Sequence, residues 1–579
     1  MEGDSLRNSK LLVLFVVLLF ASSFALAGCA PPEEAKDEEP QVEDEEKEDP
    51  DEVENPAVER PNEIIIGGPD LDGIFNPPLQ STVYDSWILG MIFDTVLTVN
   101  EDGELTTGQR SVAEDYEISD DGLEYTFYLR EGWKFHDGVE ITAEDVAFTL
   151  EVTAHPEYDG PRSTWSDNIV GVEEYREGET DEIEGIEIID DYTIQITSQE
   201  PNAGDIYDYS TWVMPSHYYE FDEYEELHEL TDDPMGSGPF KLEEYRPDEH
   251  AILVANEDYY LGEPEVDRII YEEIESEQQL PLVETGEADI VQVSSTPENL
   301  EMLQDIDFQE ELTFLDNSYN YIGIQHDNKH VENQKVRQAL AYGLDIDAFI
   351  EGLLGDELGR AIAAPFSPVS WAYPEGELNY YEYDPEKANE LLDEAGYEWD
   401  ENEEFRVDED GEKLSLQWDT IADNEWSEHL TTLALEQWPE IGVELNIDNY
   451  EFNSMVDRLD DARGEFDLWN MGWSLGTDPD PSNIFSVEYT GIGEFNTGHY
   501  HNEEAEELME EGIRTFDQDD RQEIYHELAH VFNEDLPYIF VYSSKELWSQ
   551  NDRVENFEPS AWQALSWNVH EWEVSEYQE

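Results

Sequence analysis

The chain has 579 residues, and its 147 Asp and Glu outnumber its 26 Lys and Arg, which gives a formal net charge of −121. This charge disfavours nucleic acid as a partner, because phosphate backbones are bound by basic surfaces. Since the carboxylates are spread along the whole chain, we interpret them as an adaptation to brine, where molar salt shortens the Debye length to about 3 Å and screens their repulsion. The alternative is an acidic surface for a basic partner or for calcium.

Residues 1–28 have the pattern of an export signal. Arg7 and Lys10 precede an apolar run, Leu11–Phe20, which is shorter than the roughly 20 residues that a membrane-spanning helix needs. The run is followed by Leu26-Ala27-Gly28-Cys29, which resembles the bacterial lipobox, in which the Cys thiol takes a diacylglycerol group. We therefore expect Cys29 to be lipidated and to hold the mature chain at a membrane. A stray Cys after an ordinary signal peptide is the alternative.

Residues 29–61 are predicted to be the lipidated Cys and a disordered acidic tether. From Ala30 to Pro61 the sequence is nearly all Glu, Asp, Pro and Ala, with almost no large apolar residue to bury. About 32 residues at up to 3.3–3.6 Å each would reach as much as roughly 100 Å from the bilayer. Because Cys29 is the only Cys, no thiol remains for a disulfide or a thiolate metal site.

After the tether, strand and helix signals alternate, which predicts an α/β fold. The chain is too long for one hydrophobic core, so two or three lobes are expected. Strands are predicted at Glu63–Gly68, Tyr125–Leu129 and Phe466–Met471. Helices are predicted after a capping box at Thr142, at Val336–Ile350 and at Glu386–Ala395.

The run His526-Glu527-Leu528-Ala529-His530 matches the H-E-x-x-H pattern of zinc peptidases. Two imidazoles one helical turn apart suit zinc, and the Glu would act as general base. However, Asn533 stands where the extended motif has Gly, and no third His follows at its spacing. We interpret the run as an exposed amphipathic helix with Ile524, Leu528 and Val531 facing inward, and we expect no metal.

Other signatures of catalysis or cofactor binding are incomplete. Asp408-Glu409-Asp410-Gly411 resembles part of a calcium loop, but Arg406 occupies a ligand position, so we predict a hairpin turn. No phosphate loop and no G-x-S-x-G elbow occurs, and Gly67-Gly68 lacks the rest of a dinucleotide fingerprint. Ser237 lies in a glycine-rich stretch that predicts a hinge or tight bend. No cofactor is expected.

The segment Trp469–Pro481 has the composition of a ligand-binding surface. A strand ends there in a Gly/Pro-rich loop, the kind of supported loop on which binding groups are often placed. Trp473 would pack on a ligand, and Asp478 would hold a cation such as the amine of a peptide. The predicted ligand-binding residues are Trp473, Gly476, Thr477, Asp478 and Asp480. A core Trp followed by a solvated turn is the alternative.

Several longer stretches closely resemble the signature of the family 5 extracellular solute-binding proteins, which serve peptide and nickel ABC transporters. They cover about residues 60–570, in the order SVAEDYEISDDGLEYTFYLREGWKFHDGVEITAEDVAFTLE (111–151), GSGPFKLEEYRPDEHAILVANEDYY (236–260), VRQALAYGLDIDAFI (336–350), YDPEKANELLDEAGY (383–397) and DLPYIFVYS (535–543). The resemblance also places the H-E-x-x-H run on a family helix that has no metal role.

The resemblance implies a two-lobed, periplasmic-binding-protein-like fold of the class II, cluster C type, with an extra domain inserted in the first lobe. The expected limits are 62–268 for the first lobe with its inserted domain at about 86–197, 269–540 for the second lobe, and 541–579 for the return to the first. Such lobes close over a ligand that bridges them. Peptide-binding members hold the ligand extended, with hydrogen bonds from its backbone to strands.

The resemblance also suggests how the ends of a ligand would be held. Di- and oligopeptide binders of the family carry an Asp shortly after the Gly-Trp pair, which binds the amine of the ligand. Here that position falls near Gly476, and Asp478 comes about two residues later, in a variant similar to binders of longer peptides. For the carboxylate of the ligand, the main candidates are Arg337, Arg360 and Arg463, with Arg337 better interpreted as a structural residue on a helix face.

Together these patterns imply the peptide-binding lipoprotein of an ABC importer, without catalysis. The expected partners are a small peptide, the permease and the ATPase subunits. We expect a monomer on the extracytoplasmic face of the cell membrane, in contact with the bilayer only through its lipid. Within the binding class the alternative ligand is an oligosaccharide or chelated nickel. In the enzyme class the alternative is a zinc peptidase using His526 and His530.

The charge interpretation makes a prediction about salt. The melting temperature of the purified protein should fall when the salt concentration is lowered from molar to about 0.1 M, because repulsion between the surface carboxylates is then less screened. A thermal melt at the two concentrations measures the effect, and an unchanged melting temperature would contradict the interpretation.

Overall fold

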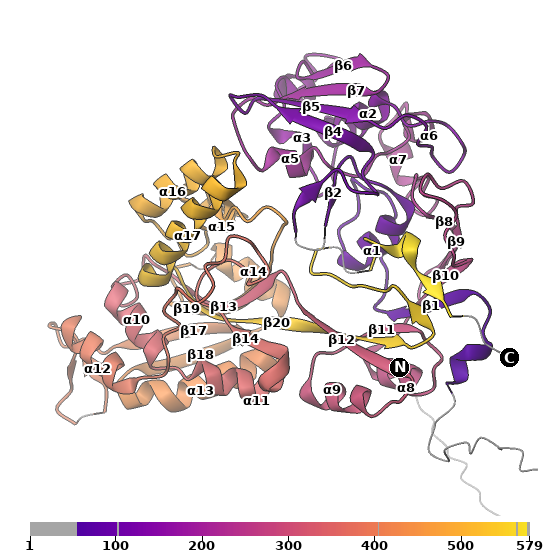
Figure 1. Ribbon diagram of the computed structural model, residues 1–579. Coiled ribbons are helices and arrows are strands. Elements are labelled where there is room, and N and C mark those ends of the chain that lie inside the picture. Colours follow the sequence, from indigo (N-terminus) through magenta and orange to yellow (C-terminus); the bar gives the residue numbers. More distant parts are fainter. Residues whose placement is uncertain (1–54, 101–102, 403, 462, 563–564, 576–579) are drawn as a thin grey trace, which may run out of the picture. The chain divides into compact units, whose positions relative to one another are not determined.

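The structure is a computed structural model that describes residues 55–100, 103–402, 404–461, 463–562 and 565–575 (Figure 1). The predicted signal peptide, Cys29 and the tether as far as residue 54 lie outside these ranges. Within the described ranges, no helix combines the length and the apolar composition needed to cross a bilayer.

The folded part begins before residue 61, where the tether was predicted to end. The residues Pro56–Glu59 form a 3-10 helix, η1, with Ala57 fully buried. Arg60 then forms an ion pair with the buried Asp289 at 2.8 Å. Composition could not indicate this ordering, because the partner of Arg60 is 229 residues away in sequence.

A mixed sheet of twelve strands runs through the described part of the chain (Figure 1). Its strands are β1 (Glu63–Gly68), β8 (Phe240–Arg246), β9 (His250–Ala255), β10 (Arg268–Glu273), β11 (Ile290–Val293), β12 (Gln309–Leu315), β13 (Ser318–Ile324), β14 (Gly359–Ala361), β17 (Ser415–Ile421), β18 (Glu444–Tyr450), β19 (Leu468–Ser474) and β20 (Tyr538–Asn551). The strand order is β18-β17-β19-β13-β20-β11-β1-β10-β9-β8, with β12 and β14 also paired to β20. The parallel pairs are β1 with β10 and β11, and β17 with β18 and β19.

The 14-residue strand β20 connects the two halves of this sheet. Its first residues pair with β13 and its last residues pair with β11, and along its length it also pairs with β14 and β12. The strand β20 therefore holds strands from both halves of the sheet in register.

Eleven helices of eight or more residues cover the sheets in the described part. They are α1 (Val83–Ile92), α2 (Ala143–Ala154), α8 (Ser276–Glu284), α9 (Pro297–Gln304), α10 (Gln334–Tyr342), α11 (Ile346–Leu358), α12 (Pro385–Glu394), α13 (Glu425–Gln437), α14 (Phe452–Asp461), α16 (Glu503–Ile513) and α17 (Gln518–Asp535). The shorter ones are α3 (Thr164–Asp167), α4 (Val172–Arg176), α5 (Asp205–Asp208), α6 (Ser216–Tyr219), α7 (Glu225–His228) and α15 (Ser482–Phe485).

Alternation along the strands of the second lobe divides its interior into two cores. On β13, Ile322 and Ile324 face a core shared with α10 to α13, whereas Tyr319 and Tyr321 face a core shared with α15 to α17. This follows from the two-residue period of a strand whose two faces are both covered. A third core packs α1 on the strands β1, β8, β9 and β10 of the first lobe.

A separate four-stranded antiparallel sheet has its own core. Its order is β4-β5-β7-β6, with β4 at Ala113–Ile118, β5 at Glu124–Leu129, β6 at Ile186–Asp190 and β7 at Thr193–Thr197. The helix α2 packs on this sheet. Together with the two lobes, this confirms the predicted α/β class and the two-lobed fold with an additional domain.

The predicted elements agree with the structure where their signals are local. The strand β1 matches the prediction, β5 differs by one residue, and the capping box at Thr142 opens α2. The predicted helix Val336–Ile350 is wrong as a single element, because α10 ends at Tyr342 and α11 begins after a new N-cap. At that cap, the Asp345 carboxylate accepts a hydrogen bond from the Ala348 N–H at 3.1 Å.

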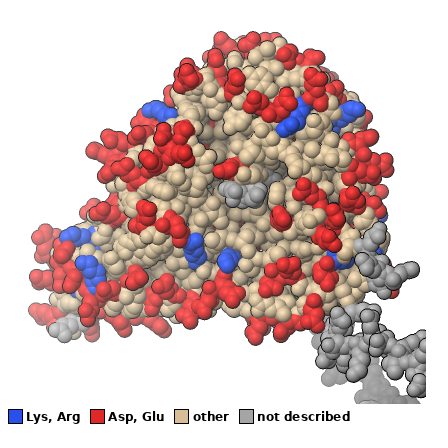
Figure 2. Space-filling view, in the orientation of Figure 1, with Lys and Arg blue, Asp and Glu red and all other residues tan. Residues whose placement is uncertain are grey.

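Carboxylates are distributed over the visible face rather than gathered in one patch, and few Lys or Arg side chains lie among them (Figure 2).

Three further two-stranded ribbons complete the described strands. These are β2 (Thr98–Val99) with β3 (Leu105–Thr106), β15 (Glu398–Trp399) with β16 (Arg406–Val407), and β21 (Val554–Glu555) with β22 (Glu573–Val574).

Gly323 allows a close cross-strand contact in the second lobe. It lies opposite Trp469 in the β13–β19 pair, and a Cβ atom added at Gly323 would meet Cε2 of Trp469 at 2.0 Å. Trp469 is 1% exposed and packs against Phe466 and Tyr538, so its ring has little room to move. The absence of a side chain at residue 323 is therefore a packing requirement.

We predict that Gly323→Ala lowers the free energy of unfolding by about 1–3 kcal/mol, the usual cost of overpacking a dense core. Gly352→Ala in α11 is the matched control, because a Cβ there meets no atom within 4 Å. This control should be neutral or stabilising by up to about 1 kcal/mol. Denaturant unfolding in molar salt measures both, and equal stabilities for the two variants would contradict the packing argument.

Candidate ligand-binding cavity

A cavity of about 550 Å³ lies between the first lobe and the middle of the large sheet. One wall comes from α1 and from the residues that follow it between Phe93 and Val99, together with Ser560, Ala561, Trp562 and Ser566. The opposite wall comes from β11, β12, β20 and the end of β19. The volume is in the range of small-molecule sites, and the lining mixes aromatic with polar side chains, as such sites do.

Aromatic rings form one part of the lining. Tyr84 and Trp87 of α1 contact each other edge to face at 5.1 Å, and Trp87 lies 5.3 Å from Trp548 of β20. Helical spacing brings the two α1 rings to one side, and the strand β20 presents Trp548 to them. The indole N–H of Trp548 has no hydrogen-bond partner among the described residues, although the side chain is 1% exposed.

A buried ion pair fixes the cavity on the side of the first lobe. Arg110 donates to the Asp94 carboxylate at 3.0 and 3.1 Å and also to the backbone carbonyls of Gly90, Phe93 and Ser566. Asp94 also accepts hydrogen bonds from the side chains of three buried neighbours, which are Trp133, Ser237 and Tyr259. Each of the three guanidinium nitrogens donates to a protein acceptor, so this pair positions the end of α1 and its loop.

Ser237 belongs to this cluster rather than to a nucleophilic site. Its hydroxyl donates to Asp94 at 3.2 Å and accepts from the Asp94 N–H at 3.2 Å. On either side of it, a Cβ at Gly236 or Gly238 would meet the carbonyl oxygen of Ile92 or Met91 at 2.1 and 2.6 Å. The glycine-rich stretch thus forms a close approach to the end of α1.

The sheet side of the cavity is acidic. Glu546 on β20 accepts a hydrogen bond from Gln292 of β11. Burial raises the pKa of Glu546, and the charge of Asp316 raises it further. Asp316 lies just after β12, where its backbone is held by hydrogen bonds with Ser367, Ser543 and Ser544.

The segment predicted to bind a ligand reaches the cavity through two residues. Ser474 and Thr477 line it. The loop is held by Asn317, whose amide donates to the carbonyls of Leu475 and Gly476 at 3.1 and 2.9 Å. Gly476 itself is exposed and is not among the residues that line the cavity.

Trp473 and Asp480 are engaged within the second lobe. Trp473 is half-buried, stacks on Tyr321 at 6.3 Å and meets Phe495 edge to face at 5.2 Å. Asp480 accepts a hydrogen bond from the Ser482 hydroxyl at 2.7 Å. Burial, with the neighbouring charge of Asp478, raises the pKa of Asp480 to about 6.

Asp478 forms a bidentate ion pair with Arg521 of α17. The two carboxylate oxygens accept from the guanidinium at 2.6 and 3.0 Å, and only 5% of the Arg521 side chain is exposed. Asp478 also lies near the first lobe, because a Cβ at Gly204 would be 3.7 Å from its carboxylate carbon. Close by, the Ala203 N–H donates to the carbonyl of Ile513 at 2.7 Å, which links the lobes.

The three arginines considered for the carboxylate of a ligand all have protein partners. Arg337 is buried and donates to Asp535 and to two backbone carbonyls, which fits a structural residue. Arg360 pairs with Glu375 and lies over the ring of Tyr373. Arg463 pairs with Asp460 at 2.8 Å and donates to three backbone carbonyls. None of the three is among the residues that line the cavity.

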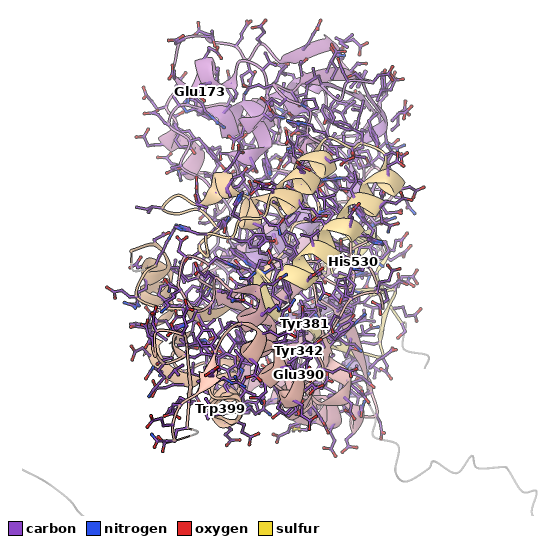
Figure 3. All side chains as sticks on the ribbon, turned by 90° about the vertical axis from the view of Figure 1, so that its left-hand side faces the viewer. Glu173, Tyr342, Tyr381, Glu390, Trp399 and His530 are labelled. Carbon is purple, nitrogen blue, oxygen red and sulfur yellow. The ribbon has the colours of Figure 1, made fainter. Side chains whose placement is uncertain are left out.

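The H-E-x-x-H run lies on α17, where Figure 3 shows His530 on the side that faces the viewer. Leu528 is buried as expected, whereas Ile524 and Val531 are only half-buried, and the buried stripe also contains Tyr525 and Phe532. His530 is 3.7 Å from Glu377. Within the described ranges, no group of three or more His, Cys, Asp or Glu is placed to hold a metal ion.

The Asp408–Gly411 run is a hairpin turn, as predicted. The Gly411 N–H donates to the carbonyl of Asp408 at 3.0 Å, and Gly411 has a φ of 78°, which favours glycine. The Asp408 carboxylate accepts from the backbone of residues 410 and 412 and pairs with Lys329 at 2.6 Å.

Sequence reasoning missed most of the cavity. Tyr84, Gln292 and the pair Glu546 and Trp548 belong to three segments with no shared motif, and only the fold brings them together. A weak signal existed for two of them, because Glu546 and Trp548 are two residues apart on one strand and therefore lie on the same face. Arg521 was missed because ion pairing with Asp478 links residues 43 positions apart.

Comparisons with known proteins agree on one family. A sequence model of the bacterial extracellular solute-binding proteins, family 5, matches residues 109–494. The oligopeptide-binding protein AppA of Bacillus subtilis is 28% identical over 516 residues, which is 88% of this chain and 91% of that relative. Heme-binding protein A of Haemophilus influenzae is 28% identical over 77% of this chain and 81% of that protein. The solved structure of B. subtilis AppA with a nonapeptide superposes with a TM-score of 0.69 at 27% identity, covering 89% of this chain and 99% of that one.

The Asp478–Arg521 pair makes a prediction about stability. Asp478→Asn removes the counter-charge of a nearly buried guanidinium, which should lower the free energy of unfolding by about 3 kcal/mol. The matched control is Glu510→Gln, which breaks the exposed pair between Glu510 of α16 and Arg514 just after this helix, and should cost no more than about 0.5 kcal/mol.

Denaturant unfolding and a peptide-binding assay on the same samples separate two roles for Asp478. Loss of stability with retained binding is expected from the contacts. An Asp478→Asn variant as stable as the unmodified protein but unable to bind peptide would contradict the structural role and favour a direct contact with the ligand.

Proposed function

The chain belongs to the bacterial extracellular solute-binding proteins of family 5, and from this premise we propose that it captures oligopeptides in the cavity between its lobes for delivery to an ABC importer. Its relatives include proteins named for binding oligopeptides and dipeptides. The observation that carries the proposal is the cavity itself, whose walls come from both lobes.

This arrangement suits capture by closure. A ligand that touches α1 on one side and β20 or Thr477 on the other adds contacts to the shut state that neither lobe makes alone. The strand β12, which among the described strands pairs with β20 alone, offers one backbone edge to an extended peptide. Aromatic and polar side chains around it leave room for different peptide side chains and for water.

For the predicted loop, we propose that Ser474 and Thr477 contact the ligand, since both line the cavity. Trp473, Gly476 and Asp480 would act by supporting this loop. Asp478 would reach a peptide amine only if the ligand competed with Arg521 for its carboxylate.

We further propose that the protein is a lipoprotein held through Cys29 on the extracytoplasmic face of the membrane, with residues 29–54 as its tether. The membrane would contact the protein only through the lipid, and the chain would act as a monomer next to its permease and ATPase subunits. We retain 62–268, 269–540 and 541–579 as the limits of first lobe, second lobe and return segment. No catalytic step is needed for this function.

The main alternative is another ligand bound by this family, and one relative of similar sequence is named for binding heme rather than a peptide. An oligosaccharide or chelated nickel would use the same cavity. The zinc peptidase alternative would require His526 and His530 on α17 to acquire further ligands.

Native mass spectrometry of protein purified in molar salt without unfolding tests the proposal. We expect the native protein to carry a bound ligand, which is released on unfolding and is identified as a peptide by fragmentation. Added peptide at about 100 times its Kd should also stabilise the ligand-free protein by about 2.7 kcal/mol, which a thermal shift detects.

Zinc analysis and a peptidase assay on the same preparation test the enzyme alternative. Co-purified heme, sugar or a nickel chelate, with no response to peptides, would contradict peptide binding. Stoichiometric zinc with cleavage of the added peptide would contradict a role limited to binding.

A further inference from the structure

The cavity has an excess of negative charge that the protein does not neutralise. Arg110 is the one Lys or Arg among the described residues that line it, and Asp94 and three backbone carbonyls use its donors. Asp316 and Glu546 also line the cavity, and neither forms an ion pair within the described part of the chain, where Glu546 accepts a hydrogen bond from the neutral amide of Gln292. When the lobes close, these carboxylates lose water, which is costly unless a cation joins them.

The two carboxylates act on the same part of the cavity. Glu546 lies opposite Phe314 in the β12–β20 pair, and Asp316 follows two residues after Phe314. Diagonal neighbours of this kind are about 7–8 Å apart between backbones, within reach of one cationic group. Consistent with this, the charge of Asp316 contributes to the raised pKa of Glu546.

The carboxylates of the salt-adapted surface do not explain this pair. Surface carboxylates face bulk water (Figure 2), whereas Glu546 and Asp316 are half-buried in a cavity wall. The neighbouring cation Lys545 does not line the cavity. It is one residue from Glu546 on β20, so its side chain leaves the strand on the opposite face, the one from which Leu547 enters the core of the second lobe.

An independent observation also indicates a ligand at this place. Trp548 follows Glu546 by two residues on β20 and therefore lies on the same face. Its indole N–H is buried without a hydrogen-bond partner among the described residues, and its ring lines the cavity. An unsatisfied buried donor is costly, and a carbonyl oxygen of a bound peptide would satisfy it.

We propose that the cavity selects peptides by a positively charged group, which Glu546 and Asp316 hold while the indole N–H of Trp548 donates to an adjacent peptide carbonyl. This rests on the proposed peptide-binding function and adds a charge preference to it. The rings of Tyr84 and Trp87, which contact each other and line the same cavity, add favourable contacts for a cation that lies against them. The cation is either the N-terminal ammonium or the side chain of Lys or Arg, which share this chemistry.

The test uses isothermal titration calorimetry on the full chain in molar salt, with ligand removed by reversible unfolding. The probes are alanine pentapeptides in which a single Lys occupies each position in turn, and matched peptides with norleucine in its place. Each is made with a free and with an acetylated N-terminus. Molar salt screens the general attraction of a cation to this acidic protein more than it screens a buried contact.

For the unmodified protein we expect the Kd of the peptide that carries its positive charge at the recognised position to be lower, by about tenfold or more, than the Kd of the matched peptide without that charge. Preference for Lys that survives acetylation identifies the side chain as the cation, and loss of binding on acetylation identifies the N-terminal ammonium. The variants Glu546→Gln and Asp316→Asn should reduce this preference to about threefold or less. Trp548→Phe should weaken the binding of all the peptides alike, raising each Kd by about two- to tenfold.

Glu523→Gln is the matched control, because it removes the same charge from the exposed face of α17 and should leave the preference unchanged. Thermal melts confirm that each variant is folded. If the acetylated norleucine peptide, which carries no cation, binds as tightly as every peptide with a Lys or a free N-terminus, the charge preference is overturned while peptide binding is left intact. A preference that persists in both Glu546→Gln and Asp316→Asn also overturns it. Binding of no peptide at all contradicts the proposed function instead.

Discussion

The hydrogen bonding of β20 is the constraint on which the rest of the structure depends. One strand of 14 residues pairs with β13 and β14 in the second lobe and with β11 and β12 beside the first, so both halves of the sheet are held by the same backbone. Its alternation then sends Leu547 into a core and Glu546 and Trp548 into the cavity. A change of one residue in its register would exchange these faces.

The charge of the protein has two different consequences. Most carboxylates lie on the surface, where the adaptation to molar salt that we propose requires no specific partner for them. The few that are buried are held by arginines or dense hydrogen bonding, as in Asp94 with Arg110, Asp289 with Arg60 and Asp478 with Arg521. Because arginines are so scarce in this sequence, each such pair marks a place where the fold must be fixed. Glu546 and Asp316 depart from this pattern, and their place is in the cavity.

The sequence predicted the class of fold and several elements, because those signals are local. The β-branched run of β1 and the capping box of α2 depend on neighbouring residues only, whereas the break between α10 and α11 depends on the capping side chain of Asp345. The predicted loop reaches the cavity at Thr477, but Asp478 pairs with a helix that the loop motif could not reveal. The cavity residues on α1, β11 and β20 were not predicted, because these segments are far apart in the sequence and come together only when the sheet forms and α1 packs on it.

The most direct test of the central claim is photocrosslinking of a bound peptide that carries a diazirine, followed by mass spectrometry of the digested protein. If the peptide lies between the lobes, adducts should form on both walls, in α1 or the residues that follow it and in β12 or β20 between Asp316 and Trp548. Excess unlabelled peptide should abolish them. Adducts confined to one lobe, or centred on α17 around His526, would contradict the account.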